Sequence, residues 1–263
     1  MNGLSTLNIE LTNKCHKSCH MCGRRKVERD YPELFQSYNT EMPFDLLELI
    51  ACQVPKDIVL QFHNNGDPLL YSRLGDALDL FPHNIKCFNT NGKLLLEKAD
   101  EIIDKLDTLT ISIIENDPEG EEQYDILRHF LRLKQDRAPF MVYRLLGNVN
   151  PMRYAELGGL VCTRILHNPM GSFEYKRQVT KPEIGICLDL LSHLVIDVYG
   201  NVFPCVRFDI NRHNLLGNIK YLSLETLWNS SKRLDLIKEH KKGNRKSSQL
   251  CAKCDFYGCP TSY

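Results

Sequence analysis

Three cysteines near the N-terminus have a spacing that favours metal chemistry. Cys15, Cys19 and Cys22 follow one another with three and then two residues between them. A closed zinc or iron–sulfur site takes four protein ligands, whereas a four-iron cluster held by three thiolates keeps one iron open to a small molecule. Half of a zinc site, a disulfide framework or chance would also explain the spacing. The motif predicts an open cluster, with these three alternatives beside it.

Residues 63–70 carry groups suited to a charged ligand. Gly66 lets the main chain come close to a ligand, and the Asp67 carboxylate can accept a charge-assisted hydrogen bond from an ammonium. The alternative is a plain Gly-Asp-Pro turn. The segment follows the second expected strand, just as the cysteine loop follows the first, and this position favours ligand binding.

A second group of cysteines lies in the C-terminal third of the chain. Its members are Cys187, Cys205, Cys251 and Cys254. Four thiolates can close an iron–sulfur cluster with no open position, and tetrahedral zinc accepts the same ligands. The residues alone therefore leave the metal open. Cys259 is an alternative ligand, a hydrogen donor or an inert thiol.

Six short apolar segments rich in β-branched residues must position these loops. They alternate with longer amphipathic segments, which is typical of an α/β fold with a parallel sheet. In the first segment Leu7, Ile9 and Leu11 alternate with polar residues, so the cysteine loop should lie at the carboxyl end of a strand, the functional end of a β/α barrel. The expected strands are residues 7–12, 57–62, 85–90, 108–114, 140–146 and 163–167.

Helices are expected between these strands. One should begin at Pro43, with Phe44, Leu47 and Ile50 as its buried stripe, and two more should cover 93–106 and 119–134. These apolar stripes are interpreted as core.

The periodicity fades around residues 168–182, which we interpret as a linker between a first unit, 1–167, and a second, 183–263. In the second unit, segments 193–198 and 202–206 flank a turn at Tyr199-Gly200-Asn201 and predict a β-hairpin. Helices should follow from Leu224, with Ser223 as its cap, and over 232–240.

The three-cysteine motif resembles that of the radical S-adenosylmethionine (SAM) superfamily. The resemblance implies a partial (β/α)6 barrel over 1–167 and a 4Fe–4S cluster on Cys15, Cys19 and Cys22. The open iron of such a cluster binds SAM and cleaves it reductively to a 5′-deoxyadenosyl radical. The family usually has an aromatic residue before the third cysteine, where this chain has Met21, so only the Met21 main chain is expected to meet the adenine.

Further positions follow the same resemblance. Residues 65–68 are similar to the family's Gly-Gly-Glu-Pro loop, with Asn65 in place of the first Gly and Asp67 in place of Glu. Gly66 and Asp67 are therefore expected to receive the ammonium of SAM. Ser112, on the fourth expected strand, is expected at the ribose. Arg144, on the fifth, is expected to bind the SAM carboxylate or a substrate hydroxyl, the alternative being a salt bridge or solvent.

The C-terminal cysteines are similar in order to those of SPASM and twitch domains, small α+β units that carry auxiliary iron–sulfur clusters. The resemblance implies one auxiliary cluster, expected as 4Fe–4S, on Cys187, Cys205, Cys251 and Cys254. Their intervals are similar to those of 2-deoxy-scyllo-inosamine dehydrogenases of aminocyclitol antibiotic synthesis.

A second cluster is a sensible electron acceptor when an alcohol radical becomes a carbonyl. We therefore expect an oxidoreductase acting on a sugar, an aminocyclitol or a similar alcohol. The alternatives are a radical SAM peptide maturase, a sugar epimerase and, from another class, a zinc-binding module without catalysis.

Composition adds limits on partners and compartment. The 263-residue chain has 33 basic and 33 acidic residues, so charge recommends neither nucleic acid nor an anionic membrane. No apolar stretch approaches the roughly 20 residues that span a bilayer, and the start lacks the layout of a signal peptide. We expect a cytoplasmic protein whose 11 cysteines stay reduced, so that those with suitable spacing can serve as metal ligands. Its partners should be a small-molecule substrate and an electron donor such as flavodoxin or ferredoxin.

Overall fold

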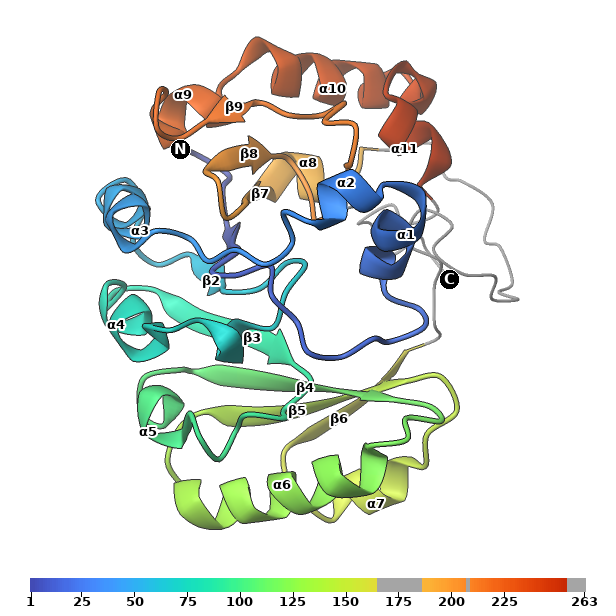
Figure 1. The fold of residues 1–263 in the computed structure, drawn as a ribbon. Helices are drawn as coiled ribbons and strands as arrows, with labels where there is room; N and C mark the ends of the chain where they lie inside the picture. The colour runs from blue at the N-terminus through green and yellow to red at the C-terminus, as the bar shows by residue number, and fades with distance from the viewer. Residues whose placement is uncertain (165–185, 207–208, 255–263) are drawn as a thin grey trace.

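The computed structural model describes residues 1–164, 186–206 and 209–254, and these are organised around one curved sheet (Figure 1). Nine strands follow the order β6-β5-β4-β3-β2-β1-β7-β8-β9. Pairing is parallel from β6 to β7 and antiparallel between β7, β8 and β9. The strands are β1 Thr6–Ile9, β2 Val59–Gln61, β3 Ile85–Thr90, β4 Thr108–Ile114, β5 Phe140–Leu146, β6 Leu160–Arg164, β7 His193–Ile196, β8 Asn201–Phe203 and β9 Gly217–Asn218.

All six predicted barrel strands and both strands of the predicted hairpin are present, and the short strand β9 was not predicted. β3, β4 and β5 have the predicted bounds, while β1 and β2 are shorter than predicted. β6 begins earlier than the predicted 163–167 because its ladder with β5 already starts at the pair Val142 and Leu160. Residues 165–167 lie outside the described ranges, as do the predicted linker 168–182 and Cys259.

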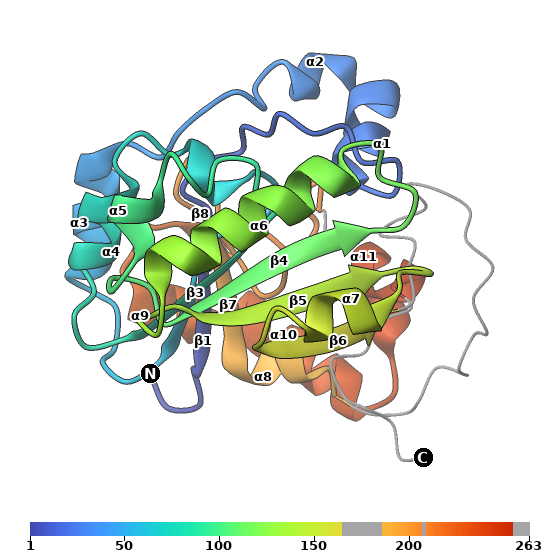
Figure 2. The same ribbon diagram turned by 90° about the horizontal axis from the view of Figure 1, so that it is seen from below.

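The sheet has one apolar and one polar face because side chains alternate along each strand. Helices lie along the apolar side (Figures 1 and 2). Its buried residues include Leu7, Ile9, Leu60, Phe62, Phe88, Leu109, Ile111, Tyr143, Leu145, Leu194 and Ile196, all part of one core. The alternation places Asn8, Glu10, His63, Asn89, Ser112, Arg144 and Asp197 on the opposite face. The polar face is therefore the inside of an open barrel.

The helices of the first unit are α1 Gly23–Asp30, α2 Pro32–Phe35, α3 Phe44–Ala51, α4 Leu74–Asp79, α5 Ala99–Ile102, α6 Gly120–Lys134 and α7 Pro151–Ala155, with a 3-10 turn at Pro68–Leu70. α3 begins after Pro43 as predicted, but Phe44 is only partly buried, with the Arg73 guanidinium 3.5 Å from its ring centroid. Leu46 joins the core beside Leu47 and Ile50. α6 matches the predicted 119–134 segment.

The predicted helix over 93–106 was wrong in its extent. Only α5 is helical there, and the residues before it form turns. The Asn91 side chain accepts a hydrogen bond from Lys93 N at 2.9 Å, and Leu95 N donates to Gly92 O, so the segment opens with tight turns. Leu95, Ala99 and Ile102 are nevertheless buried, so the predicted apolar residues pack into the core although the segment is not one continuous helix.

The second unit extends the first sheet. β7 pairs in parallel with β1, which places the predicted hairpin next to the first strand of the barrel. Gly200 turns that hairpin with a φ of 87°, a conformation that favours glycine. Ser223 caps α9 through a bond from Thr226 N, as predicted. The other elements are α8 Leu188–Ser192, α9 Leu224–Trp228, α10 Ser231–Lys241, a 3-10 turn at Arg245–Ser247 and α11 Gln249–Lys253.

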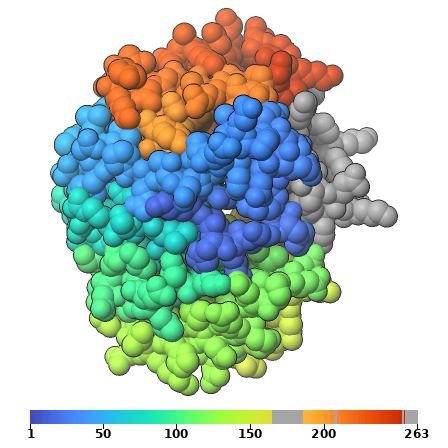
Figure 3. Space-filling model, viewed as in Figure 1, coloured from blue at the N-terminus to red at the C-terminus, as the bar shows by residue number. Residues whose placement is uncertain are grey.

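No helix within the described ranges has the length and apolar character needed to cross a bilayer. In the space-filling view the N-terminal residues, in dark blue, lie in the middle of the visible face, with green residues of the first unit below them and lighter blue and then orange residues above (Figure 3).

Candidate active site

A cavity of about 340 Å³ opens at the carboxyl ends of the parallel strands. This volume lies in the range of small-molecule sites. Cys15, Cys19 and Cys22 all line it, and so do four further residues singled out in the sequence, Met21, Gly66, Asp67 and Ser112. His63, Asn64, Asn65, Asn89, Thr90 and Asn91 complete much of its polar wall. The structure thus brings the cysteine loop and the predicted ligand-binding loop together around one space.

Arg24 holds the cysteine loop against the loop after β2. Its guanidinium donates to the carbonyl oxygens of Asn13 and, at 3.3 Å, Asn65. The side chain is buried, and its Cζ lies 5.3 Å from the Tyr38 ring centroid and 5.4 Å from that of Phe35. One buried cation therefore joins two loops and α2 at the edge of the cavity.

Lys17 fixes the middle of the cysteine loop from the other side. Its ammonium lies 2.5 Å from Asp117 and 3.3 Å from Glu119, both just before α6. Desolvation by burial opposes the charge of Lys17, but the hydrogen bond and the charge of Asp117, then those of Glu119, raise its pKa. The loop is thus anchored in its middle by Lys17 and just after its last cysteine by Arg24.

The N-terminal thiols are held in a partly buried environment. Burial raises the pKa of Cys15, and it raises the pKa of Cys19 to about 12. A metal binds the thiolate, so metal binding to these residues must release protons.

Gly66 allows two loops to pack more closely than any other residue would. A Cβ at this position would lie 2.2 Å from Thr12 O and 2.7 Å from Lys14 O. Asp67 N also donates to Lys14 O at 2.8 Å. Besides lining the cavity, the glycine is therefore needed for contact with the cysteine loop.

The Asp67 carboxylate is buried and bonded within the chain. It accepts hydrogen bonds from Thr90 Oγ1 at 2.8 and 2.9 Å, from Asn91 N at 3.1 Å and from Leu69 N at 3.1 Å. Burial raises its pKa, and the hydrogen bonds oppose that rise. Asp67 thus fixes the loop after β3, and its expected contact with the ammonium of SAM stays a prediction.

Ser112 and Arg144 are neighbours in register on β4 and β5. Ser112 lines the cavity, as does Leu146, but Arg144 is not among the lining residues. Arg144 lies beside Cys162 in the sheet, and burial, followed by the charge of Arg164, lowers its pKa. The predicted roles of Ser112 and Arg144 stay predictions.

The four C-terminal cysteines meet around a second, smaller cavity. Cys187 begins α8, Cys205 follows β8, and Cys251 and Cys254 lie at α11. The other lining residues are Asp189, Leu190, Asn214, His240, Arg245 and Leu250. Asn214 links two parts of this wall, because its Nδ2 lies 3.8 Å from Cys251 Sγ and its Oδ1 accepts from Ser248 Oγ at 2.9 Å.

Both donor sets fit iron–sulfur clusters. None of the ten cysteines in the described ranges forms a disulfide. Among the same residues, no three His, Cys, Asp or Glu side chains converge on a position for one metal ion. Each set instead surrounds a space, with three thiols at the large cavity and four at the small one. Three thiolates suit a cluster with an open iron, and four suit a closed cluster.

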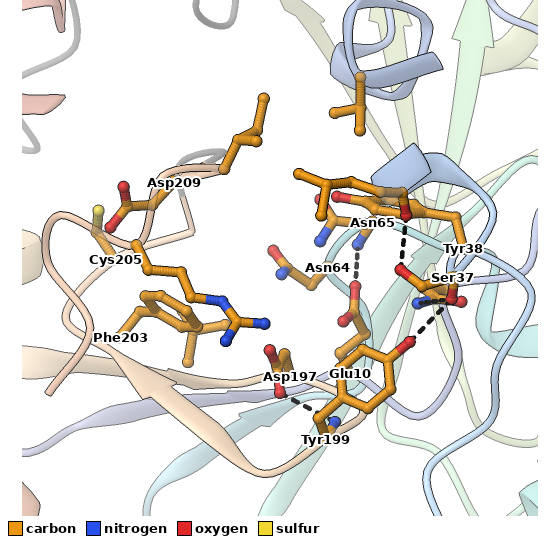
Figure 4. A pocket seen from close by; sticks show the side chains of 16 residues that line it. Glu10, Ser37, Tyr38, Asn64, Asn65, Asp197, Tyr199, Phe203, Cys205 and Asp209 are labelled. Atoms are coloured by element: carbon orange, nitrogen blue, oxygen red, sulfur yellow. Dashed lines mark hydrogen bonds between the residues drawn. The ribbon is translucent and has the colours of Figure 1, made fainter. Parts of the chain in front are cut away.

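A third pocket, of about 130 Å³, lies between these two sites (Figure 4). It shares Asn64 and Asn65 with the first cavity and Cys205 with the second. In Figure 4, Cys205, Phe203 and Asp209 form one wall, while Glu10, Asn65 and Tyr38 face them. The shared residues show that the third pocket adjoins both cysteine cavities.

Glu10 lies at the centre of this third pocket, just beyond β1. It is 2% exposed, and its carboxylate accepts from Asn65 N at 2.8 Å and from Val198 N at 3.3 Å. Burial raises its pKa to about 7, and the charge of Asp197 contributes to the rise. Asp197 accepts from Tyr199 N, Asn201 N and Asn201 Nδ2 at 2.8 to 2.9 Å.

Sequence reasoning missed Glu10 and Asp197. The available signal was a carboxylate inside an alternating apolar segment, between Ile9 and Leu11. In an open sheet such a residue faces solvent, and only the curvature of this sheet turns it toward an interior.

Comparison with known proteins agrees with this geometry. Residues 187–255 match the SPASM family, described as an iron–sulfur cluster-binding domain. The chain is 25% identical to the S-adenosyl-L-methionine-dependent 2-deoxy-scyllo-inosamine dehydrogenase of Niallia circulans, over 95% of this chain and 92% of that protein.

Two solved structures share the fold. The crystal structure of BtrN in complex with AdoMet and 2-DOIA superimposes with a TM-score of 0.68 and 18% identity, over 99% of this chain and 97% of that one. The structure of anSMEcpe with bound AdoMet gives a TM-score of 0.58 and 12% identity, over 96% of this chain and 85% of that one. The mixed α/β architecture predicted from the sequence is confirmed.

Proposed function

We propose that this chain, a radical SAM iron–sulfur enzyme with a C-terminal SPASM domain, oxidises a secondary alcohol of a small polyhydroxylated amine, such as an aminocyclitol, to a carbonyl. The observation that carries the proposal is the pocket between the two cysteine sites. Its walls share residues with both sites, so a small molecule in it would lie between a SAM site and an electron acceptor.

The residues present would hold the cofactors as follows. Cys15, Cys19 and Cys22 would bind the first 4Fe–4S cluster, and SAM would occupy the cavity that these cysteines line. An auxiliary cluster would take its ligands from Cys187, Cys205, Cys251 and Cys254. When bound, the first cluster supplies the electron that cleaves SAM, and the resulting 5′-deoxyadenosyl radical removes a hydrogen atom from the substrate.

The chain itself would orient both small molecules. Met21, Gly66, Asp67 and Ser112 line the SAM cavity and are proposed to position its adenine, ammonium and ribose. In the pocket beside it, the acidic side chains of Glu10, Asp197 and Asp209 outnumber the Arg212 guanidinium and favour a substrate that carries hydroxyl and ammonium groups. A peptide maturase is less well supported, because this pocket of about 130 Å³ suits one small ring.

Arg144 remains the proposed catalytic arginine on the fifth strand. It does not line the cavities described, so contact with SAM or substrate would require its side chain to extend past Ser112 or Leu146, which do line the SAM cavity. The proposal also includes a cytoplasmic location and an electron donor such as flavodoxin or ferredoxin, because thiolate-bound clusters need a reducing compartment and an external electron.

Anaerobic incubation with SAM, a reductant and candidate alcohols tests the proposal. The probes are 2-deoxy-scyllo-inosamine and simple sugars, and mass spectrometry scores 5′-deoxyadenosine and the carbonyl product. We expect substrate-dependent formation of both with an aminocyclitol. An alcohol recovered with deuterium from heavy water would instead identify an epimerase, and a colourless, zinc-loaded protein would overturn the cluster assignments.

A further inference from the structure

The pocket between the cysteine sites contains a carboxylate whose bonds leave room for a proton. Each oxygen of Glu10 accepts one backbone hydrogen bond, from Asn65 N at Oε1 and from Val198 N at Oε2, the second at a long 3.3 Å, and the Asn65 side chain is a further hydrogen-bond partner. A carboxylate oxygen has two acceptor positions. Glu10 therefore keeps acceptor capacity while it is fixed in place by the main chain.

The carboxylate of Asp197, next to Glu10, accepts hydrogen bonds from residues of the hairpin turn. Its Oδ1 accepts from Tyr199 N and Asn201 N, and its Oδ2 accepts from Asn201 Nδ2. These bonds close the turn between β7 and β8. Asp197 consequently supplies negative charge next to Glu10 but has less acceptor capacity to offer a substrate.

The groups facing Glu10 come from several elements. Tyr38 follows α2, Asp197 and Tyr199 belong to the hairpin turn, and Asp209 and Arg212 precede β9. Burial is the largest cause of the raised pKa of Glu10, which is about 7, and the negative charge of Asp197 adds to the rise. The positive charge of Arg212 in turn opposes the rise in the pKa of Asp197. A pKa of about 7 at Glu10 suits a base that works near neutral pH.

Glu10 also lies between the two cofactor sites. Its partner Asn65 lines the SAM cavity, and Cys205, a proposed ligand of the auxiliary cluster, lines the same pocket as Glu10. Figure 4 shows Glu10 and Asn65 joined by a hydrogen bond and facing the wall that carries Cys205. A substrate here would contact the carboxylate with the hydrogen acceptor on one side and the electron acceptor on the other.

We propose that Glu10 is the general base that removes the hydroxyl proton of the substrate. The inference rests on the proposed dehydrogenation. The substrate carbon loses a hydrogen atom to the SAM-derived radical, and its hydroxyl proton passes to a Glu10 oxygen. One electron leaves for the auxiliary iron–sulfur cluster. One C–H and one O–H bond break, a C=O bond forms, and the two electrons removed from the alcohol are accounted for.

The test measures carbonyl product formed per 5′-deoxyadenosine, with 2-deoxy-scyllo-inosamine as the probe. Glu10→Gln keeps the size of the side chain but cannot accept a proton, so the ratio should fall about 100-fold, the usual contribution of a general base. Glu121→Gln is the matched control. Glu121 is exposed, with a side chain 82% accessible, and pairs with Arg153 far from the pocket, so its variant should keep the wild-type ratio.

The pH profile separates a base from a purely structural residue. In the wild type the ratio should rise with pH through about 7, because only deprotonated Glu10 accepts the proton. Asp197→Asn removes a neighbouring negative charge and should move the midpoint to lower pH. Glu10→Gln should abolish this limb of the profile.

A direct titration keeps the proposal testable if Glu10→Gln folds poorly. Infrared difference spectra of the cluster-loaded wild type should show a carboxylic acid band that is lost as pH rises through about 7. If the wild type shows no substrate-dependent 5′-deoxyadenosine, the proposed function fails. If the wild type turns over while Glu10→Gln keeps the same ratio and pH profile, or no carboxylic acid titrates near 7, the assignment of Glu10 is overturned.

Discussion

The two cysteine sites use the same donor atoms but differ in what surrounds them. At the N-terminal site three thiols share a cavity of about 340 Å³ with the polar loops that follow β2 and β3. At the C-terminal site four thiols line a smaller cavity together with Leu190 and Leu250. The site with three thiols thus has the larger cavity, and the site with four thiols has the smaller one. An open site can exchange a small molecule, whereas a closed one is limited to electron transfer.

The two sites are also held in different ways. The N-terminal cysteine loop is fixed by contacts between loops, through Arg24, Lys17 and the close approach of Gly66. Of the C-terminal cysteines, Cys205 follows β8 and the other three lie within or next to the short helices α8 and α11. Ser248 caps α11 by accepting from Cys251 N at 3.3 Å. Changes to the first site should therefore disturb ligand binding, while changes to the second should disturb electron removal.

Cys19→Ala should have the largest effect. Loss of a thiolate at the three-ligand site removes the means of binding the cluster, so 5′-deoxyadenosine formation should fall to background. Chromatographic measurement of 5′-deoxyadenosine checks this. Cys52→Ala is the control, because Cys52 is exposed and lines neither cysteine cavity. Wild-type rates of SAM cleavage in Cys19→Ala would show that the reactive site has been wrongly located.

Cys254→Ala should separate the two sites. It removes one ligand of the closed set, so carbonyl product should fall far more than 5′-deoxyadenosine. The measurement is the ratio of the two compounds, together with iron content before and after the change. An unchanged ratio at reduced iron content would mean that the C-terminal site has a structural role only.

Gly66→Ala should weaken SAM binding through sterics. The new Cβ would lie 2.2 Å from Thr12 O, so the two loops must move apart at a cost of about 1–3 kcal/mol. A loss of about tenfold in SAM affinity corresponds to roughly 1.4 kcal/mol and is readily seen by equilibrium dialysis. Gly120→Ala is a matched control, since a Cβ there meets nothing within 4 Å. Equal affinities in the two variants would contradict the packing argument.

Arg245→Gln should give the smallest effect, confined to the closed site. Arg245 is 9% exposed and lines the cavity of the four thiols, where its positive charge favours the reduced, more negative cluster. Removing that charge should lower the reduction potential of the auxiliary cluster by an amount on the order of tens of millivolts. Redox titration followed by electron paramagnetic resonance measures it. Lys246→Gln, at the exposed neighbour, should leave the potential unchanged, and a rise in Arg245→Gln would contradict the expectation.

Local patterns accounted for much of the fold and for the metal donors. β3, β4 and β5 were predicted with their bounds because they are the longest strands of the sheet and pair with neighbours on both sides. The 93–106 segment was overestimated, since an apolar stripe of helical spacing does not reveal that Asn91 and Gly92 begin it with tight turns. Arg144 was singled out for a possible ligand contact, and its partly buried place on β5 is consistent with an inward position, yet the sequence did not indicate that it lies outside the cavity linings.

The sequence by itself determined which side chains are available for cofactors, because ligand type and spacing are local properties of Cys15, Cys19, Cys22 and the Cys251–Cys254 pair. Only the tertiary structure decided where a substrate would bind. That pocket exists because β7 pairs in parallel with β1, as in the 2.7 Å contact between Asn8 and His193, which are 185 residues apart. Pairing over such a distance depends on the closure of the whole sheet. It is this pairing that turns Glu10 from an apparent surface residue into the centre of the site.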